Sequence, residues 1–503
     1  MITTILFDIG DTLVRSAAPG TPVDALVAVP MPGAVRTLRA LARSYRLGAV
    51  TDTSVMDGAA VKRALAGTGL DDLLEVIVTS VDVGAAKPDG RGLLAALERL
   101  DAAADEALFV GDAEVDEQAA RAAGMHFARV SRDVDVRRAV RRVLTDDADA
   151  FAAALALVGP TDERAAANAR EHQDRLTKPR GALGRVEDLG VQLAGIAAID
   201  PPPRPVPAAV AVFAGDHGVV AEGVTPWPQE VTAQMVANFV AGGAAINVLA
   251  RQAGASVTVV DVGVATDLDA LGLASAPNLL RRRVRAGTAN LAAGPALDAA
   301  DVDAALVIGA AVADELVEAG AAALVTGDMG IGNTTAAAAV IAALTGRPPA
   351  TVVGRGTGID DDMLARKTRV IERAVARLPA DAGARSVLAE VGGLELAALA
   401  GFIVAGASHC VPVVVDGVIA GASLLAAASM HPDVVAYAVA GHRSSEPGAS
   451  AVLAELGLEP VLDLGLRLGE GSGACLALGV LDAAALVLTE MATFDTAGVT
   501  DKS

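Results

Sequence analysis

The sequence predicts an α/β protein in which parallel sheets are divided between two domains. The chain has 503 residues, more than one hydrophobic core usually supports. Short β-branched runs alternate with Ala- and Leu-rich runs of helical length, the rhythm of a parallel sheet with helices between its strands. Hydrophobic residues make up 53% of the chain and aromatic residues only 2%, so we expect cores of small aliphatic side chains.

The first domain is predicted to span residues 1–142. Its predicted strands are residues 3–8, 47–51, 76–79, 108–110 and 127–130, and its predicted helices are residues 33–44, 59–66, 92–100 and 116–123. A basic helix at residues 137–142 then gives way to the acidic stretch 145–149, which favours a boundary there. The Pro-rich stretch 201–207 is a rival boundary that we interpret as an internal loop.

The second domain, residues 143–503, repeats the alternation of strands and helices. Its predicted strands are residues 208–214, 257–260, 324–326, 411–415 and 434–439. The most membrane-like stretch, residues 401–430, contains His409, Pro412 and Asp416, so we interpret it as a buried strand flanked by helices. The N-terminus lacks the basic start and long apolar run of a signal peptide.

Charge and cysteine content narrow the classes of partner and compartment. The net charge of −21 disfavours nucleic acid and anionic membrane surfaces. Small anions are still compatible with this charge, because backbone amides at a helix N-terminus can hold a phosphate. The two cysteines, Cys410 and Cys475, belong to no CxxC pair or zinc-like cluster, so we expect a reduced protein in the cytoplasm.

Four segments of the first domain carry oxygen-bearing or cationic side chains in a fixed order. One predicted strand ends in Asp8 and the next in Thr51, AAKPDG carries Lys87, and FVGDAEVD carries Asp112 and Asp116. Open parallel sheets bind ligands at these strand ends. An aspartate that attacks phosphorus needs a divalent cation held by further carboxylates, with a hydroxyl and an ammonium on the phosphoryl oxygens. The four segments supply this set.

In these segments the chain resembles the haloacid dehalogenase-like hydrolases. The resemblance implies that Asp8 is the nucleophile, that Thr51 and Lys87 hold the phosphate, and that Asp8, Asp112 and Asp116 bind Mg²⁺. The family's phosphatases usually place a second aspartate two residues after the nucleophile, as the acid for the leaving group. Here that position is Gly10, with Asp11 one residue later. A general acid contributes about 10²- to 10⁴-fold to rate, so the absence of this aspartate would be expected to lower phosphatase activity.

Glycine-rich turns follow the strands of the second domain. The segment ALVTGDMGIGNTTAAAAVIAAL is a strand, a turn and an Ala-rich helix whose free amides can bind a phosphate. It lacks the Lys-Ser/Thr ending of a Walker loop and the full GxGxxG spacing, which disfavours ATP and dinucleotides. The loop VVGRGTGIDDDMLARK adds the cations Arg355 and Lys367. The turn LRLGEGSGA sets Glu470 between glycines, where helix propensity gives no reason for a carboxylate.

Together with LTKPRGALGRVEDL, AGDHGVVAEGVTPWPQEVT and AGHRSSEPG, these turns resemble the nicotinate-nucleotide:dimethylbenzimidazole phosphoribosyltransferases. The resemblance implies that Glu470 is the general base and that Asp328, where the family usually has glutamate, is a second catalytic residue. It implies that Trp227 and Gln229 line the benzimidazole pocket. The remaining substrate-binding positions would be Thr225, Gly330, Gly332, Asn333, Arg355, Lys367, Ser444, Ser445, Arg467 and Leu468.

The complete prediction is therefore two Rossmann-like parallel-sheet domains, the C-terminal one with an additional small helical domain that the resemblance implies. The same resemblance implies a homodimer, with nicotinate mononucleotide and a benzimidazole base as substrates and no cofactor for the transfer. Three interpretations of the first domain stay open. It removes the phosphate from the product of the second domain, α-ribazole 5′-phosphate; it acts on another phosphate ester; or it is an inactive module that serves assembly.

Overall fold

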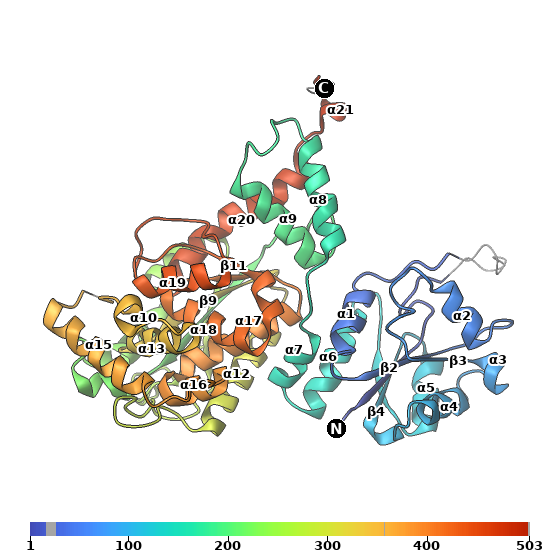
Figure 1. Ribbon diagram of the computed structural model, residues 1–503, viewed down its shortest axis with the longest axis horizontal. Helices are drawn as coiled ribbons and strands as arrows, with labels where there is room; N and C mark the ends of the chain where they lie inside the picture. Colours follow the sequence, from blue (N-terminus) through green and yellow to red (C-terminus); the bar gives the residue numbers. More distant parts are fainter. Residues whose placement is uncertain (17–26, 357, 501–503) are drawn as a thin grey trace. The chain divides into compact units, whose positions relative to one another are not determined.

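The computed structural model describes residues 1–16, 27–356 and 358–500, which form two compact units (Figure 1). The N-terminal unit is Met1–Pro160 and the C-terminal unit is Thr161–Ser503. Each unit contains its own parallel sheet, so the predicted fold class is confirmed.

All five strands predicted in the N-terminal unit are present in one parallel sheet. They are β1 (Thr4–Phe7), β2 (Arg46–Thr51), β3 (Val76–Thr79), β4 (Ala107–Gly111) and β5 (His126–Arg129), in the order β3-β2-β1-β4-β5. The order reverses at β1, which pairs with β2 on one side and with β4 on the other. Asp8 directly follows β1, so it lies at the switch point where open α/β sheets bind ligands.

Alternating side chains of these strands bury opposite faces of the sheet. Ile5 and Phe7 pack into the core covered by α1 (Ala34–Leu41), α2 (Gly58–Ala64) and α6 (Val136–Asp147). Leu6 and Phe109 pack into the core covered by α4 (Arg91–Arg99) and α5 (Glu114–Ala123). The short helices α3 (Ser80–Val83) and η2 (Ala104–Glu106) lie in connections.

The units divide later in the sequence than the predicted boundary at residue 142, which falls inside α6. The next helix, α7 (Ala150–Leu157), contributes Ala153 and Leu157 to the core shared by α1 and α6. Asp147 also accepts a hydrogen bond from the backbone N–H of Ile2 at 2.7 Å. The change from basic to acidic residues therefore marks an exposed helix end and not the end of the domain.

The C-terminal unit contains a six-stranded parallel sheet in the order β11-β10-β9-β6-β7-β8. The strands are β6 (Ala208–Gly215), β7 (Ser256–Gly263), β8 (Leu279–Arg281), β9 (Ala323–Met329), β10 (Val413–Val415) and β11 (Ala438–Ala440). The prediction missed β8, a short edge strand. It was also wrong for most of residues 434–439, because Pro432 begins the 3₁₀ helix η4 (Pro432–Tyr437) and β11 starts only after it.

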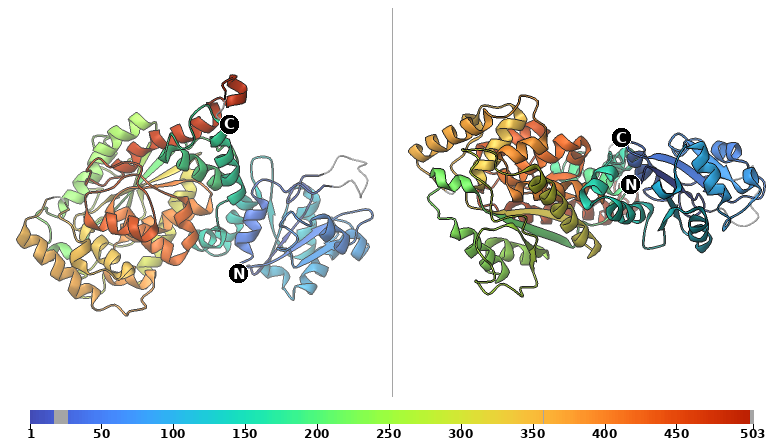
Figure 2. Two further views of the ribbon diagram at one scale, coloured as in Figure 1. Left: turned by 45° about the horizontal axis from the view of Figure 1, so that its top comes forward. Right: turned by 90° about the horizontal axis from the view of Figure 1, so that it is seen from below.

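Helices cover both faces of this sheet (Figure 2). One face packs against α10 (Glu230–Val240), α11 (Ala245–Ala253) and α20 (Ser472–Glu490). The other packs against α17 (Leu394–Ser408), which is buried along its whole length and lies between the sheet and α12 (Ala299–Glu318). The two helices approach closely: a Cβ atom at Gly309 would lie 1.7 Å from the Ala398 carbonyl oxygen. The remaining helices of the unit are η3 (Gly218–Glu222), α13 (Asn333–Thr345), α14 (Pro349–Val352), α15 (Asp361–Val375), α16 (Ala384–Val391), α18 (Val418–Met430) and α19 (Pro447–Leu456).

Segments from both ends of the C-terminal unit form a small helical bundle. It consists of α8 (Glu163–Arg175), α9 (Arg185–Ala197) and the end of α20, with the short α21 (Phe494–Ala497) following. The backbone N–H of Thr177 donates to the Ala492 carbonyl at 3.0 Å, which links the first and last segments of the C-terminal unit.

The apolar stretch 401–430 contains the end of α17, strand β10 and α18, as predicted. Two other helical stretches, Glu230–Ala253 and Ser472–Glu490, are long and apolar enough to cross a membrane by length and composition. In this structure their apolar side chains pack against the sheet, as in the core helices of many globular proteins.

Candidate functional sites

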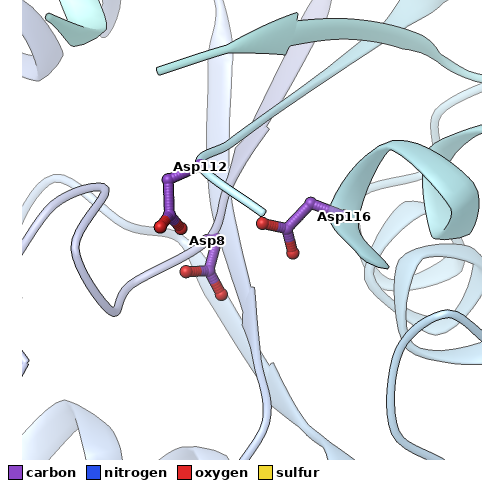
Figure 3. A group of neighbouring side chains, drawn as sticks. All are labelled: Asp8, Asp112 and Asp116. Carbon is purple, nitrogen blue, oxygen red and sulfur yellow. The ribbon is translucent and has the colours of Figure 1, made fainter. Parts of the chain in front are cut away.

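Three carboxylates meet at the carboxyl edge of the N-terminal sheet (Figure 3). Asp8 follows β1, Asp112 follows β4, and Asp116 lies in the first turn of α5. One oxygen of each lies within 4.8 Å of the others. Hard oxygen donors in this arrangement suit a hard divalent cation.

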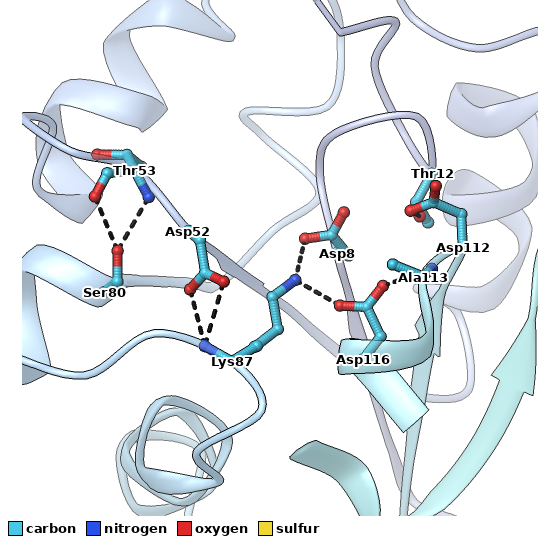
Figure 4. A network of polar contacts seen from close by, with 9 residues as sticks. All are labelled: Asp8, Thr12, Asp52, Thr53, Ser80, Lys87, Asp112, Ala113 and Asp116. Carbon is cyan, nitrogen blue, oxygen red and sulfur yellow. Dashed lines mark hydrogen bonds and ion pairs between the residues drawn. The ribbon is translucent and has the colours of Figure 1, made fainter. Parts of the chain in front are cut away.

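Lys87 lies between two of these carboxylates (Figure 4). Its Nζ is 2.5 Å from Asp8 Oδ1 and 2.5 Å from Asp116 Oδ1, and its side chain is only 7% exposed. Burial opposes the charge of Lys87, but the two aspartates outweigh burial and raise its pKa. Burial raises the pKa of Asp8 to about 6, against the opposing effect of Lys87. The backbone N–H of Lys87 is held separately by Asp52, at 3.1 Å from Oδ2.

The three aspartates differ in how their oxygens are occupied. Asp116 uses Oδ1 for Lys87 and Oδ2 for the backbone N–H of Ala113, at 2.9 Å. Asp112 makes a longer contact, 3.4 Å from the Thr12 hydroxyl, and burial together with the charge of Asp116 raises its pKa. Asp8 and Asp112 therefore offer freer oxygens to a cation than Asp116, which orients Lys87.

The surroundings of Gly10 show where the usual acid is missing. A Cβ atom at Gly10 would lie 4.0 Å from Asp8 Oδ2 and 3.1 Å from Ser16 Oγ. Asp11 has a φ of 53° and its Oδ1 accepts a hydrogen bond from the backbone N–H of Ser16 at 2.9 Å. Its charge acts on Asp112. Gly10 and Thr51 line one cavity of about 260 Å³ with mostly apolar walls.

In the C-terminal unit a cavity of about 390 Å³ opens at the carboxyl ends of β9, β10 and β11. It collects eight of the predicted site residues: Trp227, Asp328, Gly330, Asn333, Ser444, Arg467, Leu468 and Glu470. A neighbouring cavity of about 50 Å³ is lined by Thr225, Trp227, Gly330, Gly332, Asn333, Arg355 and Lys367, among others. The two cavities meet at the turn that precedes α13.

Two predicted residues line neither cavity. Gln229, at the start of α10, lies beside the carboxylate of Asp216 and helps to stabilise its charge. Ser445 is exposed, and its backbone N–H donates to the Leu466 carbonyl at 3.1 Å. The adjacent Ser444 is buried and does line the larger cavity.

Glu470 lies in a strained turn against the end of β9. Its φ is 64°, between Gly469 at 83° and Gly471 at 92°. A Cβ atom at Gly327 would lie 2.6 Å from the Glu470 carbonyl oxygen, so only glycine allows the turn to approach the strand. Glu470 Oε2 accepts a hydrogen bond from the backbone N–H of Ile246 at 3.2 Å. Burial raises the pKa of Glu470, and the charge of Asp416 adds to the effect. A base with a raised pKa suits proton removal near neutral pH.

Asp328 lies beside Glu470 in the same cavity. Its Oδ2 accepts a hydrogen bond from Asn333 Nδ2 at 2.9 Å, and a Cβ atom at Gly469 would lie 3.3 Å from that oxygen. Burial raises the pKa of Asp328 well above its usual value, and the charges of Asp416 and Glu395 add to the shift. These surroundings therefore favour the protonated form of Asp328.

Lys367 projects from α15 to the floor of the smaller cavity. Its side chain is buried, and Nζ donates to Thr334 Oγ1 at 2.9 Å and to the Gly354 carbonyl at 3.2 Å. Burial lowers the pKa of Lys367 to about 8, against the opposing charge of Glu446. A buried ammonium among neutral acceptors, at a helix N-terminus, is a strong attractor for a phosphate.

Sequence reasoning missed several polar residues of this site. Glu446 and His442 line the larger cavity, and Glu446 Oε1 accepts from the backbone N–H of Gly356 at 2.8 Å. His442 Nε2 lies 3.4 Å from Asp416 Oδ1. Glu446 and His442 lie within the segment AGHRSSEPG, so a closer inspection of that turn could have found them. Asp416 follows β10 and could have been found as a strand-end acid.

Comparison with known proteins assigns the two units to two different families. Residues 158–499 match a family model described as phosphoribosyltransferase, and residues 24–130 match one described as haloacid dehalogenase-like hydrolase. A nicotinate-nucleotide–dimethylbenzimidazole phosphoribosyltransferase of Salinispora tropica is 57% identical over 69% of this chain and 98% of its own length. The enzyme of that name from Chloroflexus aurantiacus is 52% identical over 69% of this chain and 97% of its own length.

A solved structure is similar over the same region. The crystal structure of nicotinate-nucleotide–dimethylbenzimidazole phosphoribosyltransferase from Thermus thermophilus covers 68% of this chain and all of its own, with 48% identity and a TM-score of 0.65. The N-terminal unit carries the haloacid dehalogenase-like domain, over residues 24–130. Through residues 158–499, the chain belongs to the family of nicotinate-nucleotide:dimethylbenzimidazole phosphoribosyltransferases.

Proposed function

We propose that the C-terminal unit transfers 5-phosphoribosyl from nicotinate mononucleotide to 5,6-dimethylbenzimidazole, giving α-ribazole 5′-phosphate and nicotinate for the lower ligand of cobalamin. The observation that carries this proposal is the buried carboxylate of Glu470, which a tight glycine turn holds on the wall of a cavity of nucleotide size. One benzimidazole nitrogen attacks C1′ while the other loses its proton to Glu470. The bond from C1′ to the pyridinium nitrogen breaks, and nicotinate leaves without protonation of its ring nitrogen. No metal or other cofactor is required for this step.

The two cavities suit the two parts of the reaction. Lys367, Arg355 and the amides at the start of α13 surround the smaller cavity, which suits the 5′-phosphate. Trp227, Leu468 and Val231 give the larger cavity an apolar wall, which suits a flat benzimidazole. Asp328 supports the reacting centre next to Glu470. Asp328 is one methylene shorter than the glutamate that the family usually has at this position, so its carboxylate reaches less far toward the substrate.

We further propose that the N-terminal unit is an Mg²⁺-dependent phosphomonoesterase with Asp8 as nucleophile. The carboxylates of Asp8 and Asp112 would hold the cation with support from Asp116, and their hard oxygen donors fit it. When bound, Mg²⁺ supplies charge neutralisation to the phosphoryl oxygens. Asp8 attacks phosphorus while the bond from phosphorus to the ester oxygen breaks, and the leaving alcohol takes a proton from water. A water molecule then releases phosphate from Asp8. Lys87 orients Asp8, and Thr51 faces the phosphoryl group.

The substrate favoured for this unit is α-ribazole 5′-phosphate. It is a phosphomonoester formed by the same polypeptide, and fusion raises its local concentration at the second site. The cavity of about 260 Å³ beside Gly10 and Thr51 has an apolar wall that suits an aromatic base. The absence of an acid at Gly10 favours the alternative of an inactive domain. An unrelated phosphate ester is the other alternative, and the sequence does not distinguish it from α-ribazole 5′-phosphate.

The protein is proposed to act as a homodimer in the cytoplasm, without nucleic acid or membrane partners. Trp227 is 48% exposed and Leu468 is 57% exposed at the mouth of the cavity, and a second subunit would cover such side chains. The net charge of −21 opposes binding to polyanions. Light scattering on the full chain gives the oligomeric state directly.

One incubation tests both proposed activities. The full chain is mixed with nicotinate mononucleotide and 5,6-dimethylbenzimidazole, with and without Mg²⁺, and the products are separated by chromatography. α-Ribazole 5′-phosphate is expected without Mg²⁺, and free α-ribazole only with it. Absence of every ribazole species would overturn the transferase assignment, whereas phosphorylated product alone in the presence of Mg²⁺ would remove the coupled hydrolysis.

A further inference from the structure

A completely buried ion pair lies behind the two cavities of the C-terminal unit. His217 Nε2 is 2.7 Å from Glu395 Oε1, and neither side chain is exposed. His217 comes just after β6, and Glu395 lies in the first turn of α17. Burial disfavours the imidazolium, but the charges of Glu395 and Asp216 outweigh burial and raise the pKa of His217. Burying two charged side chains costs free energy, and this cost suggests that the pair has a structural or functional role.

The imidazole packs directly beneath the turn that precedes α13. A Cβ atom at Gly330 would lie 3.4 Å from Cδ2 and from Nε2 of His217, and one at Gly332 would lie 3.3 Å from its Cβ. On the other side, a Cβ atom at Gly393 would lie 2.5 Å from Cε1. The ring therefore fills the space between the turn and the start of α17, and Glu395 fixes its orientation.

A second contact holds the same turn from a neighbouring element. The backbone N–H of Ile331 donates to Thr232 Oγ1 at 3.1 Å, on α10. Thr232 in turn stabilises the charge of Asp216, whose Oδ2 accepts from the backbone N–H of Ala265 at 2.8 Å. The turn 330–332 is thus supported at its middle by Thr232 and at both glycines by His217.

We propose that His217, anchored by Glu395, is a positioning residue that holds the turn 330–332 in the shape that binds the 5′-phosphate of the nucleotide. This inference rests on the function proposed above for that turn. Amides at a helix start bind a phosphate only when they converge on it, and a misplacement of about 1 Å can cost about 10²-fold. His217 acts through the turn and does not contact the reacting atoms.

Two variants of the full chain test the role of the pair. His217→Gln retains an N–H donor but loses the ring beneath the turn, and Glu395→Gln keeps the anchor's size but removes its charge. Each is assayed with nicotinate mononucleotide and with nicotinate riboside, which lacks only the phosphate, and 5,6-dimethylbenzimidazole as acceptor. Inhibition by inorganic phosphate provides a second measure of the phosphate site.

The expected signature is a loss confined to the phosphate. The KM for nicotinate mononucleotide should rise about 10- to 100-fold in His217→Gln, and less in Glu395→Gln, with kcat nearly unchanged. The kcat/KM for nicotinate riboside should stay within about twofold of wild type, and inhibition by inorganic phosphate should weaken in parallel with the rise in KM. His409→Gln is the matched control, because His409 also pairs with an acid, Asp314, at 2.6 Å, but outside both cavities.

Equal losses with both donors would overturn the inference, since they would show a general structural effect or an effect on the base. Unchanged KM and unchanged inhibition by phosphate in both variants would overturn it as well. A wild-type protein that does not use nicotinate mononucleotide would instead overturn the proposed function. Phosphate binding to the wild type and to Glu395→Gln, measured by calorimetry, would then still decide whether the pair shapes an anion site.

Discussion

Each unit contains a buried lysine close to acidic residues. The pKa values of these two lysines are shifted in opposite directions. Lys87 lies 2.5 Å from two carboxylates, which raise its pKa despite burial. Lys367 donates to a hydroxyl and a carbonyl, and burial lowers its pKa to about 8. The positive charge of Lys87 is therefore compensated by two aspartates of the same unit. Lys367 donates to neutral oxygens, so its positive charge can pair with the phosphate of a bound substrate.

Burial raises the pKa of acids in both sites, but the two sites differ in whether a lysine lies beside them. In the N-terminal unit, Lys87 opposes the effect of burial on Asp8, whose pKa rises only to about 6, so Asp8 is largely ionised at neutral pH and available for nucleophilic attack. In the C-terminal unit, Asp328 and Glu470 lie near Asp416 without a lysine between them, and burial raises both pKa values. Such acids accept or hold protons. This difference fits the attack on phosphorus proposed for the N-terminal site and the proton transfer proposed for the C-terminal site.

The largest expected effect tests whether the two sites work independently. Asp8→Asn removes the proposed nucleophile and one partner of Lys87, so Mg²⁺-dependent hydrolysis of phosphate esters should fall below detection. The transferase rate, measured as nicotinate release, should not change. If phosphate release persists in Asp8→Asn, the nucleophile has been assigned to the wrong residue.

Glu470→Gln tests the other half of the contrast. It removes the base without changing side-chain size, and kcat for nicotinate release should fall by about 10²- to 10⁴-fold. Hydrolysis by the N-terminal unit serves as the internal control. Glu470 already has a positive φ, and glutamine adds no new backbone strain there, so the variant should fold normally. A normal kcat would show that another group takes the proton.

The fold was largely predictable because its strands are strongly patterned. Every strand of the N-terminal sheet was predicted, and β1 to β4 are largely buried apolar runs between helical segments. The edge of the C-terminal sheet was harder. Strand β8 has three residues, and the apolar run 434–439 does not reveal that Pro432 starts a 3₁₀ turn. Short apolar runs fit either structure, and tertiary context decides between them.

Local sequence singled out the turn of Glu470 and the glycines before α13, and the structure brings both to one cavity. Local sequence could not indicate partners that are far apart along the chain. His217 and Glu395 are 178 residues apart and meet only because β6 and α17 pack together. Gln229 was predicted to line the benzimidazole pocket, and in this structure it lies beside Asp216 and lines neither cavity. Local sequence indicates a functional turn, but not which side chain supports it.

Gly10→Asp would sharpen the comparison within the hydrolase site. The new side chain would start 4.0 Å from Asp8 Oδ2, where it can protonate an alkoxide leaving group, and Ser16 Oγ would have to rotate away. Hydrolysis of an alkyl phosphate should rise about 10- to 100-fold, less than the full contribution of an optimised acid. Hydrolysis of 4-nitrophenyl phosphate, whose leaving group needs no proton, should change little. Equal gains on both esters would indicate a better-formed site and not a new acid.

The mildest effect concerns the charge of Lys367. With a pKa of about 8, its ammonium is progressively lost at higher pH, while the substrate phosphate stays dianionic. The KM for nicotinate mononucleotide should therefore rise about tenfold per pH unit above pH 8. Bound phosphate stabilises the cation, so kcat at saturation should respond less than KM.

Lys367→Arg distinguishes this titration from other effects of alkaline pH. Arginine stays charged throughout the range, so the alkaline rise in KM should disappear even if the larger guanidinium weakens binding at neutral pH. Lys87 provides the comparison within the same chain, because two carboxylates keep its pKa above the usual value and hydrolysis should show no step near pH 8. A step near pH 8 in both activities would mean that the partners of the two lysines do not decide their charge, and the contrast between the sites would fail.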